Sequence, residues 1–274
     1  MSRDLEAKLI KALPKVQIER IKTKHAGHAE TLAYEAAKAS RRPLIISVSG
    51  DGGYHEVVNG LMKAQLNGAR PVAGLLPGGN ANDHHRMLHQ GDLVQNIVSQ
   101  TEQTIDLLKL SAFAKGKLIE RFGHSYIGIG LTPKAGKELN KTKLNRLKET
   151  VIVLRSIIWL RPVRIIVRGK RRAYDSVIFS NIDTMSKVMT LSKNAKLDDG
   201  KFEVTAFRRR NRWRLIRLLL RASTLGLKGT THRKKFPFTT TAPLLMQVDG
   251  EIMKVDANSQ ITVTSEHAML RCIV

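Results

Sequence analysis

Two glycine-rich segments carry the residues best suited to binding phosphate. Residues 49–53 read Ser-Gly-Asp-Gly-Gly, and residues 77–80 read Pro-Gly-Gly-Asn. Each follows a compact apolar run, at 44–48 and at 72–76, that is typical of a buried strand. Glycine lets backbone N–H groups approach a phosphate closely, and a helix that begins after the turn adds partial positive charge. On its own, a Gly-Asp-Gly segment is better interpreted as an ordinary turn capped by the Asp side chain.

The presence of two such segments favours a binding site over two unrelated turns. In an open α/β sheet, the turns at the carboxyl ends of the strands share one crevice. We therefore predict one phosphate pocket lined by both segments, with the side chains of Asn80, Asn82 and Asp83 beside it. Asp51 is unusual there, because a carboxylate next to a phosphate is repulsive unless it holds a metal, a ribose hydroxyl or a backbone N–H.

Further carboxylates lie late in the chain. Residues 249–251 read Asp-Gly-Glu, after an expected strand at 244–248. Asp-Gly is a strong hairpin signal, so on its own this segment is better interpreted as a turn. A turn and a catalytic base are nevertheless compatible, since a carboxylate near an alcohol proton can assist its removal. Carboxylates, together with phosphate oxygens and water, are also the ligands that Mg²⁺ prefers.

The elements that must position these residues change in character along the chain. Helical patterns at 5–12, 27–39 and 56–64 alternate with apolar runs at 16–21, 44–48 and 72–76, which predicts a parallel α/β sheet. Short β-type runs then follow, interrupted by helical patterns at 143–159 and 212–221, and they predict mainly antiparallel strands. These later runs span 125–129, 163–167, 176–179, 202–206, 244–248 and 261–264. We expect two domains, at 1–107 and 108–274.

Charge and cysteine content restrict the partners. The 274 residues include 47 Lys and Arg against 23 Asp and Glu, a formal charge of +24 that indicates an anionic partner. One cysteine, Cys272 in an apolar run, excludes an internal disulfide and a cysteine-rich zinc site, and fits a reducing compartment. The longest apolar run, 151–160, is shorter than the about 20 residues of a membrane-spanning helix. With no secretory signal at the N-terminus, we expect a cytoplasmic protein.

Four segments together resemble a known family. SGDG at 49–52 with HEVVNGL at 55–61, PGGNAND at 77–83, LDDGKF at 197–202 and VDGE at 248–251 occur in the order found in the diacylglycerol kinase catalytic family. The first segment is most similar to the sphingosine and ceramide kinase branch, and the second to the bacterial diacylglycerol kinases. The resemblance implies an NAD kinase/diacylglycerol kinase-like fold: a parallel-sheet nucleotide-binding α/β domain and an antiparallel β-sandwich domain, with the final strand packing back on the first.

The resemblance also implies roles for individual residues. Glu251 would be the general base on a lipid hydroxyl, supported by the carboxylates of Asp83 and Asp249. Asp198 and Asp199 would belong to a loop associated with Mg²⁺. Asp51, Asp83 and Glu251 are expected to face one gap between the domains. The nucleotide, ATP, would be contacted by Ser49, Gly50, Asp51, Gly52, Gly53, Glu56, Pro77, Gly78, Gly79, Asn80 and Asn82.

The sequence departs from the family pattern at several places. Gly53 stands where most members carry Thr or a larger residue, so a hydroxyl that could meet a phosphate is missing. No Asn-Pro-x-Ser-Gly turn precedes residue 16, Leu131-Thr132 replaces an acidic position, and 185–187 lack the usual glycines. These differences keep open a weakly active or inactive member that binds anionic membranes or nucleic acid. An NAD kinase-like enzyme, which shares the Gly-Asp-Gly turn, is the other alternative.

A basic amphipathic helix is expected at 211–222. Arg210, Arg214, Arg217 and Arg221 fall on one helical face, which suits an anionic membrane surface. Aromatic residues make up only 5% of the chain, so few platforms exist for stacking on bases. We therefore expect a lipid substrate and peripheral membrane association rather than nucleic acid, with a homodimer as a further possibility.

Overall fold

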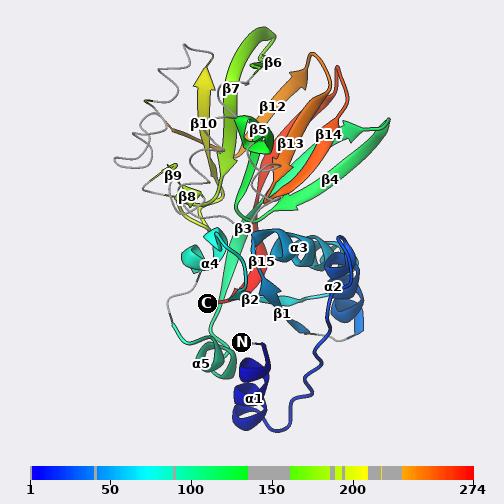
Figure 1. Ribbon diagram of the computed structural model, residues 1–274, viewed down its shortest axis with the longest axis vertical. Helices are drawn as coiled ribbons and strands as arrows, with labels where there is room; N and C mark the ends of the chain where they lie inside the picture. Colours follow the sequence, from blue (N-terminus) through cyan, green and yellow to red (C-terminus); the bar gives the residue numbers. More distant parts are fainter. Residues whose placement is uncertain are drawn as a thin grey trace. The chain divides into compact units, whose positions relative to one another are not determined.

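The chain forms two compact units, Met1–Ile105 with Ala268–Val274, and Asp106–His267. The computed structural model in Figure 1 describes residues 2–39, 42–88, 91–134, 161–185, 189–192, 195–208, 217 and 230–274. The sequence-based division lies after residue 107. No helix in these ranges combines the length and the apolar character needed to cross a membrane.

A parallel sheet forms the centre of the first unit. Strand β1 (Leu44–Ser49) pairs with β2 (Val72–Pro77) along their whole length, in parallel. The last residues of β15 (Gln260–Ile273) pair in parallel with β2, with Arg271 opposite Val72. The helices of this unit are α1 (Ser2–Ala12), α2 (His28–Ala39), α3 (Asp51–Leu66), α4 (Asp83–Leu88) and α5 (Leu93–Val98).

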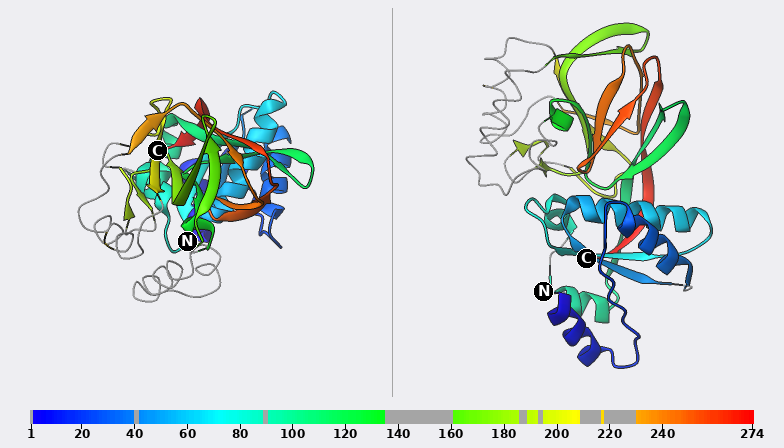
Figure 2. Two further views of the ribbon diagram at one scale, coloured as in Figure 1. Left: turned by 90° about the horizontal axis from the view of Figure 1, so that it is seen from above. Right: turned by 45° about the vertical axis from the view of Figure 1, so that its right-hand side comes forward.

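The helices α2 and α3 pack side by side, as Figures 1 and 2 show. The contact is close because α3 carries Gly60 there. A Cβ atom at this position would lie 2.2 Å from the carbonyl oxygen of Glu30 and 3.0 Å from the amide nitrogen of Tyr34. The glycine therefore sets how near the two helices approach, and α2 in turn holds α3 in place.

The expected alternation of helix and strand is confirmed for 44–76, and one expected strand is wrong. Residues 16–21 form no strand, because no neighbouring strand pairs with them and Val16 and Ile21 remain about half exposed. Helix α3 begins five residues earlier than the pattern at 56–64 indicates. It starts directly after the N-cap Gly50, so the glycines at 52 and 53 belong to its first turn.

The second unit is built from antiparallel strands. Apart from the short pair β8 and β9, they belong to one sheet, in which β7 pairs with β5, β6 and β10. Its strands are β3 (Glu102–Ala114, which begins in the first unit), β4 (Lys117–Gly123), β5 (Tyr126–Gly130), β6 (Val163–Val167), β7 (Lys170–Ser180), β8 (Thr184–Met185), β9 (Met189–Thr190), β10 (Phe202–Arg208), β11 (Thr231–Arg233), β12 (Lys235–Thr240), β13 (Leu244–Val248) and β14 (Glu251–Val255), with the first part of β15.

One face of these antiparallel strands forms a hydrophobic core. Alternate residues point to it, as in β7, where Val177 and Phe179 join this core and Ile178 between them does not. Phe179 packs against Phe202, Phe236 and Phe238, with ring centroids 5.2–6.4 Å apart. A parallel first unit and an antiparallel second unit confirm the predicted fold class. The predicted helices at 143–159 and 211–222 lie outside the described residues, except for Arg217.

Candidate functional site

The two glycine turns of the first unit lie against each other. Strands β1 and β2 end together, with Ser49 opposite Pro77, and the amide of Gly78 donates to the carbonyl of Ser49 at 2.8 Å. A Cβ atom on Gly79 would lie 2.4 Å from the Cα of Gly50, and one on Gly50 would lie 2.8 Å from the Cα of Gly79. Real side chains do not tolerate such distances, so both positions require glycine. The close approach leaves Gly78, Gly79 and Asn80 exposed.

The first turn of α3 is formed by small residues. Gly50 is the N-cap and supplies no side-chain cap to the helix. Ser49 directs its hydroxyl toward the carbonyl oxygen of Gly50 at 3.1 Å and contacts the hydroxyl of Ser47 at 2.7 Å. A Cβ atom on Gly53 would lie 2.7 Å from the Ser49 hydroxyl oxygen. A side chain at 53 would therefore compete for space with the side chain of Ser49.

Two predicted site residues in the second turn are used to build it. Asn82 has a left-handed backbone (φ 51°), and its amide group closes the loop: Oδ1 accepts from the amide of Gly79, and Nδ2 donates to the carbonyl of Gly79, both at 2.9 Å. Asp83, which begins α4, is buried and accepts from Arg86 at 2.5 Å. Arg86 also donates to the carbonyl of Ala81. The side chains of Asn82 and Asp83 thus fix the loop that presents Gly79 and Asn80.

Asp51 and Glu56 have contacts that link the turns to neighbouring helices. Oδ1 of Asp51 accepts from the amide of His84 in α4 at 3.3 Å, so this carboxylate bridges the two predicted turns. Glu56 accepts from the amides of Gly27 at 2.8 Å and Ala29 at 3.1 Å. Glu56 was predicted to contact the nucleotide. Its two oxygens cap the start of α2, where the N-terminal amides of a helix need acceptors, and its contact with the nucleotide stays a prediction.

The surroundings of His85, the third residue of α4, determine the charge of its ring. Burial lowers the pKa of His85, and the positive charge of Arg86 lowers it further, while Asp51 acts in the opposite direction. At neutral pH the ring is therefore uncharged. Arg86, an arginine of the same helix, is paired with Asp83.

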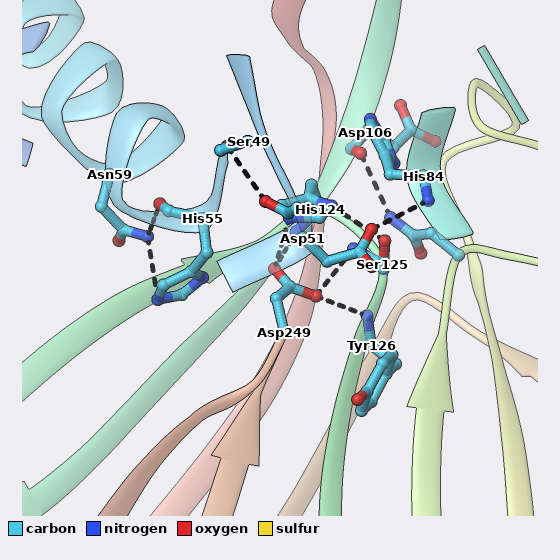
Figure 3. A network of polar contacts seen from close by, with 12 residues as sticks. Ser49, Asp51, His55, Asn59, His84, Asp106, His124, Ser125, Tyr126 and Asp249 are labelled. Carbon is cyan, nitrogen blue, oxygen red and sulfur yellow. Dashed lines mark hydrogen bonds and ion pairs between the residues drawn. The ribbon is translucent and has the colours of Figure 1, made fainter. Parts of the chain in front are cut away.

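In the second unit, Asp249 is buried and organises a loop. Its carboxylate accepts from the amides of His124 (2.7 Å), Ser125 (3.0 Å) and Tyr126 (2.8 Å), as Figure 3 shows. The ring of His124 lies 3.4 Å from the same carboxylate, and neither side chain is exposed. Asp249 and Gly250 both have positive φ, 45° and 102°, and join β13 to β14 in a two-residue turn. The hairpin predicted for 249–250 is confirmed.

Glu251 differs from Asp249 although only one residue separates them. It is the first residue of β14, and its side chain is 41% exposed. Its carboxylate lies 3.7 Å from Nε of Arg121 on β4. Because Asp249 fixes the turn and strand pairing fixes β14, an accessible carboxylate is presented on a rigid hairpin. Its convergence with Asp51 and Asp83 stays a prediction.

Asp198 and Asp199 lie in an exposed segment that a buried carboxylate holds. Asp106 accepts from the amide of Gly200 at 2.5 Å and from His267 at 2.7 Å, and its own amide donates to the carbonyl of Leu197 at 2.6 Å. Sequence reasoning missed Asp106, although a charged residue within the apolar run 105–108 was a usable signal. Asp106 is completely buried.

The donor atoms of Asp198 and Asp199 decide whether this segment suits Mg²⁺. Carboxylate oxygens are the right donor type, but one oxygen of Asp199 already accepts from the amide of Lys201 at 3.0 Å. Within the described ranges, no three His, Cys, Asp or Glu side chains are placed to hold one ion. A metal site made by these side chains alone does not fit the segment.

Comparisons with known proteins agree with these features. Residues 2–110 match the diacylglycerol kinase catalytic domain. The chain is 26% identical over 252 residues to a diacylglycerol kinase of Bacillus subtilis strain 168, covering 82% of this chain and 78% of that protein. It is 29% identical over 272 residues to one of Staphylococcus haemolyticus, covering 84% and 75%. A crystal structure of a diacylglycerol kinase from Bacillus anthracis strain Sterne shares the fold, with a TM-score of 0.70 at 21% identity, over 99% and 91% of the two chains.

Proposed function

Since the chain belongs to the diacylglycerol kinase catalytic-domain family, we propose that it transfers the γ-phosphoryl group of ATP to the hydroxyl of a diacylglycerol- or sphingoid-type lipid at a membrane surface. The observation that carries this proposal is the contact between Gly50 and Gly79 at the beginning of α3. It supports phosphate binding because bare backbone from two loops meets at one helix N-terminus.

The first unit supplies the phosphate site in this proposal. Helix α3 is 16 residues long, and its N-cap provides no side-chain acceptor for the first amides. Such amides, together with the helix dipole, favour a bound anion. The exposed backbone of Gly78 and Gly79 lies directly beside them. The carboxylate of Asp51 is compatible with phosphate at this edge because it accepts a hydrogen bond from the amide of His84.

The second unit supplies the base. An alcohol is a weak nucleophile, and a carboxylate within hydrogen-bond reach assists by taking its proton. In the proposed step, the lipid hydroxyl loses its proton to Glu251 while its oxygen attacks the γ-phosphorus. The bond from that phosphorus to the bridging oxygen breaks, and ADP leaves. Asp249 is a positioning residue, because its contacts hold the turn from which Glu251 projects.

Phosphate transfer from radiolabelled ATP tests the activity against diacylglycerol, sphingosine, ceramide and undecaprenol, with NAD as the alternative acceptor. Glu251→Gln keeps the side-chain size and removes the base, so we expect kcat to fall by about 10²–10⁴-fold. Thermal stabilisation by ATP should persist in this variant, because ATP is assigned to the first unit. Transfer to NAD alone would replace the lipid kinase proposal with the NAD kinase-like one.

Glu120→Gln is the matched control for the base. Glu120 lies on β4, its side chain is 43% exposed, and it is paired with Lys109 at 2.7 Å. It therefore resembles Glu251 in exposure and charge but has no proposed role. We expect its kcat to remain within about twofold of the wild-type value. If Glu251→Gln also retained its kcat, the assignment of Glu251 as base would be wrong.

A further inference from the structure

One hairpin of the second unit is strongly basic and takes no part in the proposed chemistry. Residues 161–172 include no Asp or Glu. No ion pair joins their cationic side chains to a carboxylate within the part of the chain that the structure describes. The exposed cationic residues of this segment are Arg161, Arg164, Arg168, Lys170, Arg171 and Arg172. We refer to residues 161–172 as the basic hairpin.

The turn of the basic hairpin places Arg168 in a left-handed backbone conformation that arginine rarely adopts. Val167 pairs with Lys170, so the loop consists of Arg168 and Gly169, which have φ values of 51° and 72°. Such turns favour Asn-Gly, because the first position is left-handed and a long side chain is unfavourable there. Arg168 places a guanidinium group at the outermost point of the hairpin.

The hairpin is firmly attached to the second unit. Strand β6 pairs with β7 on one side and with β12 on the other, and the hydroxyl of Thr241 donates to the carbonyl of Arg164 at 2.8 Å. Val163 and Val167 pack against the hydrophobic core. Figure 1 and the right-hand view of Figure 2 show the β6–β7 turn at an end of this unit. Its cationic side chains are therefore presented on a pre-organised surface.

We propose that the basic hairpin binds the anionic headgroups of a membrane. This partner rests on the proposed function, because the acceptor lipid of such a kinase resides in a bilayer. The segment contains no Phe, Tyr or Trp, so it offers no platform for stacking on bases. Between the arginines, the half-buried aliphatic Ile166 shares the outward face with Arg164 and Arg168. Arginines around an aliphatic side chain suit the headgroup layer of an anionic leaflet.

Vesicle binding without ATP tests this proposal separately from catalysis. The full chain is mixed with vesicles of phosphatidylcholine alone or with 30% phosphatidylglycerol, and the bound fraction is measured by sedimentation. Wild type should bind the anionic vesicles, and less at higher salt. Arg168→Asn should bind them about fivefold more weakly, and the double variant with Lys170→Gln about 25-fold more weakly. Because Asn suits this turn, Arg168→Asn should keep or raise the melting temperature.

Lys115→Asn is a matched control within the same unit. Lys115 and Gly116 form the β3–β4 turn, with φ values of 51° and 71°, so the backbone geometry and the lost charge are the same. There, however, the carboxylate of Asp256 accepts from the amides of Lys115 at 3.2 Å and Gly116 at 3.0 Å, which places a negative charge at the turn. We expect vesicle binding to be unchanged in this variant.

The outcomes separate the two proposals. Equal vesicle binding by wild type and Arg168→Asn overturns the hairpin proposal, even if the protein phosphorylates lipids. If Arg168→Asn weakened binding to duplex DNA but not to vesicles, the partner would be nucleic acid and the membrane proposal would be wrong. If wild type transferred phosphate to no lipid, even in detergent micelles, the kinase proposal would fail. The Arg168→Asn effect on vesicles would still support membrane docking by the hairpin.

Discussion

The two units fix their loops by different means. In the first unit the turns at 49–53 and 77–80 pack backbone against backbone, with Gly50 against Gly79, and the side chains of Asn82 and Asp83 hold the second turn. In the second unit buried carboxylates do this work: Asp249 gathers the amides of 124–126, and Asp106 holds the segment at 197–200. The first amides of α3 have no side-chain cap, whereas the amides of residues 124–126 are all taken by Asp249. This difference favours the first unit as the phosphate site that we propose.

Removing a loop-holding carboxylate should produce the largest effect. Asp249→Ala leaves the buried amides of His124, Ser125 and Tyr126 without their acceptor, so we expect the free energy of unfolding to fall by about 3–5 kcal/mol. Urea denaturation measures this change. Asp256→Ala is the control, because Asp256 also accepts from two turn amides, but those amides are exposed and water can replace it. Equal losses in the two variants would contradict the role of burial.

Adding one methyl group to the glycine contact should have an intermediate effect. In Gly79→Ala the new Cβ would lie 2.4 Å from the Cα of Gly50, so the backbone must move, and we expect a loss of about 2–3 kcal/mol. Gly52→Ala adds the same group where no atom lies within 4 Å. Since Gly52 is in the first turn of α3, its replacement should leave stability unchanged or raise it by up to about 1 kcal/mol. Thermal unfolding compares the two variants, and a stable Gly79→Ala would show that the packing is looser.

Glu203 tests whether every buried carboxylate of the second unit holds a loop. Burial raises its pKa from 4.5 to about 7. Its Oε2 has no hydrogen-bond partner among the described residues, and Oε1 lies 3.4 Å from the ring of His232. Because the folded state binds the proton more tightly than the unfolded state, this stabilisation is complete below pH 4.5 and is lost as pH rises through about 7.

The expected loss for Glu203 is the smallest of the three. We expect a loss of about 1–2 kcal/mol between pH 5 and 8. Denaturant unfolding at several pH values measures the loss. Glu203→Gln should remove this component from the pH profile. A profile that does not change would show that Glu203 is ionised and paired throughout.

The sequence predicted the first unit better than the second because its signals are local. A strand, a glycine turn and a helix follow one another within 44–66, so their order alone indicates the parallel arrangement. The strand expected at 16–21 failed because an apolar run shows that a strand is possible, while pairing requires a neighbour elsewhere in the chain. The 13-residue strand β3 was missed because its polar and apolar residues do not alternate regularly. The segment was interpreted as the boundary between the two domains.

The carboxylate roles needed contacts between distant residues. Asp249 binds amides 123–125 positions earlier, and Asp106 contacts His267, 161 positions later. Contacts between residues so far apart in the chain leave no pattern in the local sequence. The sequence therefore grouped Asp249 with Glu251 as catalytic residues, and the structure separates a buried acid from an exposed one.

The pairing of β15 with β2 has a consequence for how the protein is made. Arg271 and Cys272 complete the first sheet beside Val72 and Ala73, Cys272 contacts the hydroxyl of Tyr54 at 3.5 Å, and Gln65 donates to the carbonyl of Met269 at 2.9 Å. During translation, residues 1–105 leave the ribosome long before residues 268–274. The sheet of the first unit therefore lacks one strand until the second unit has been translated. Until then β2 presents an unpaired apolar edge, the kind of surface that chaperones protect.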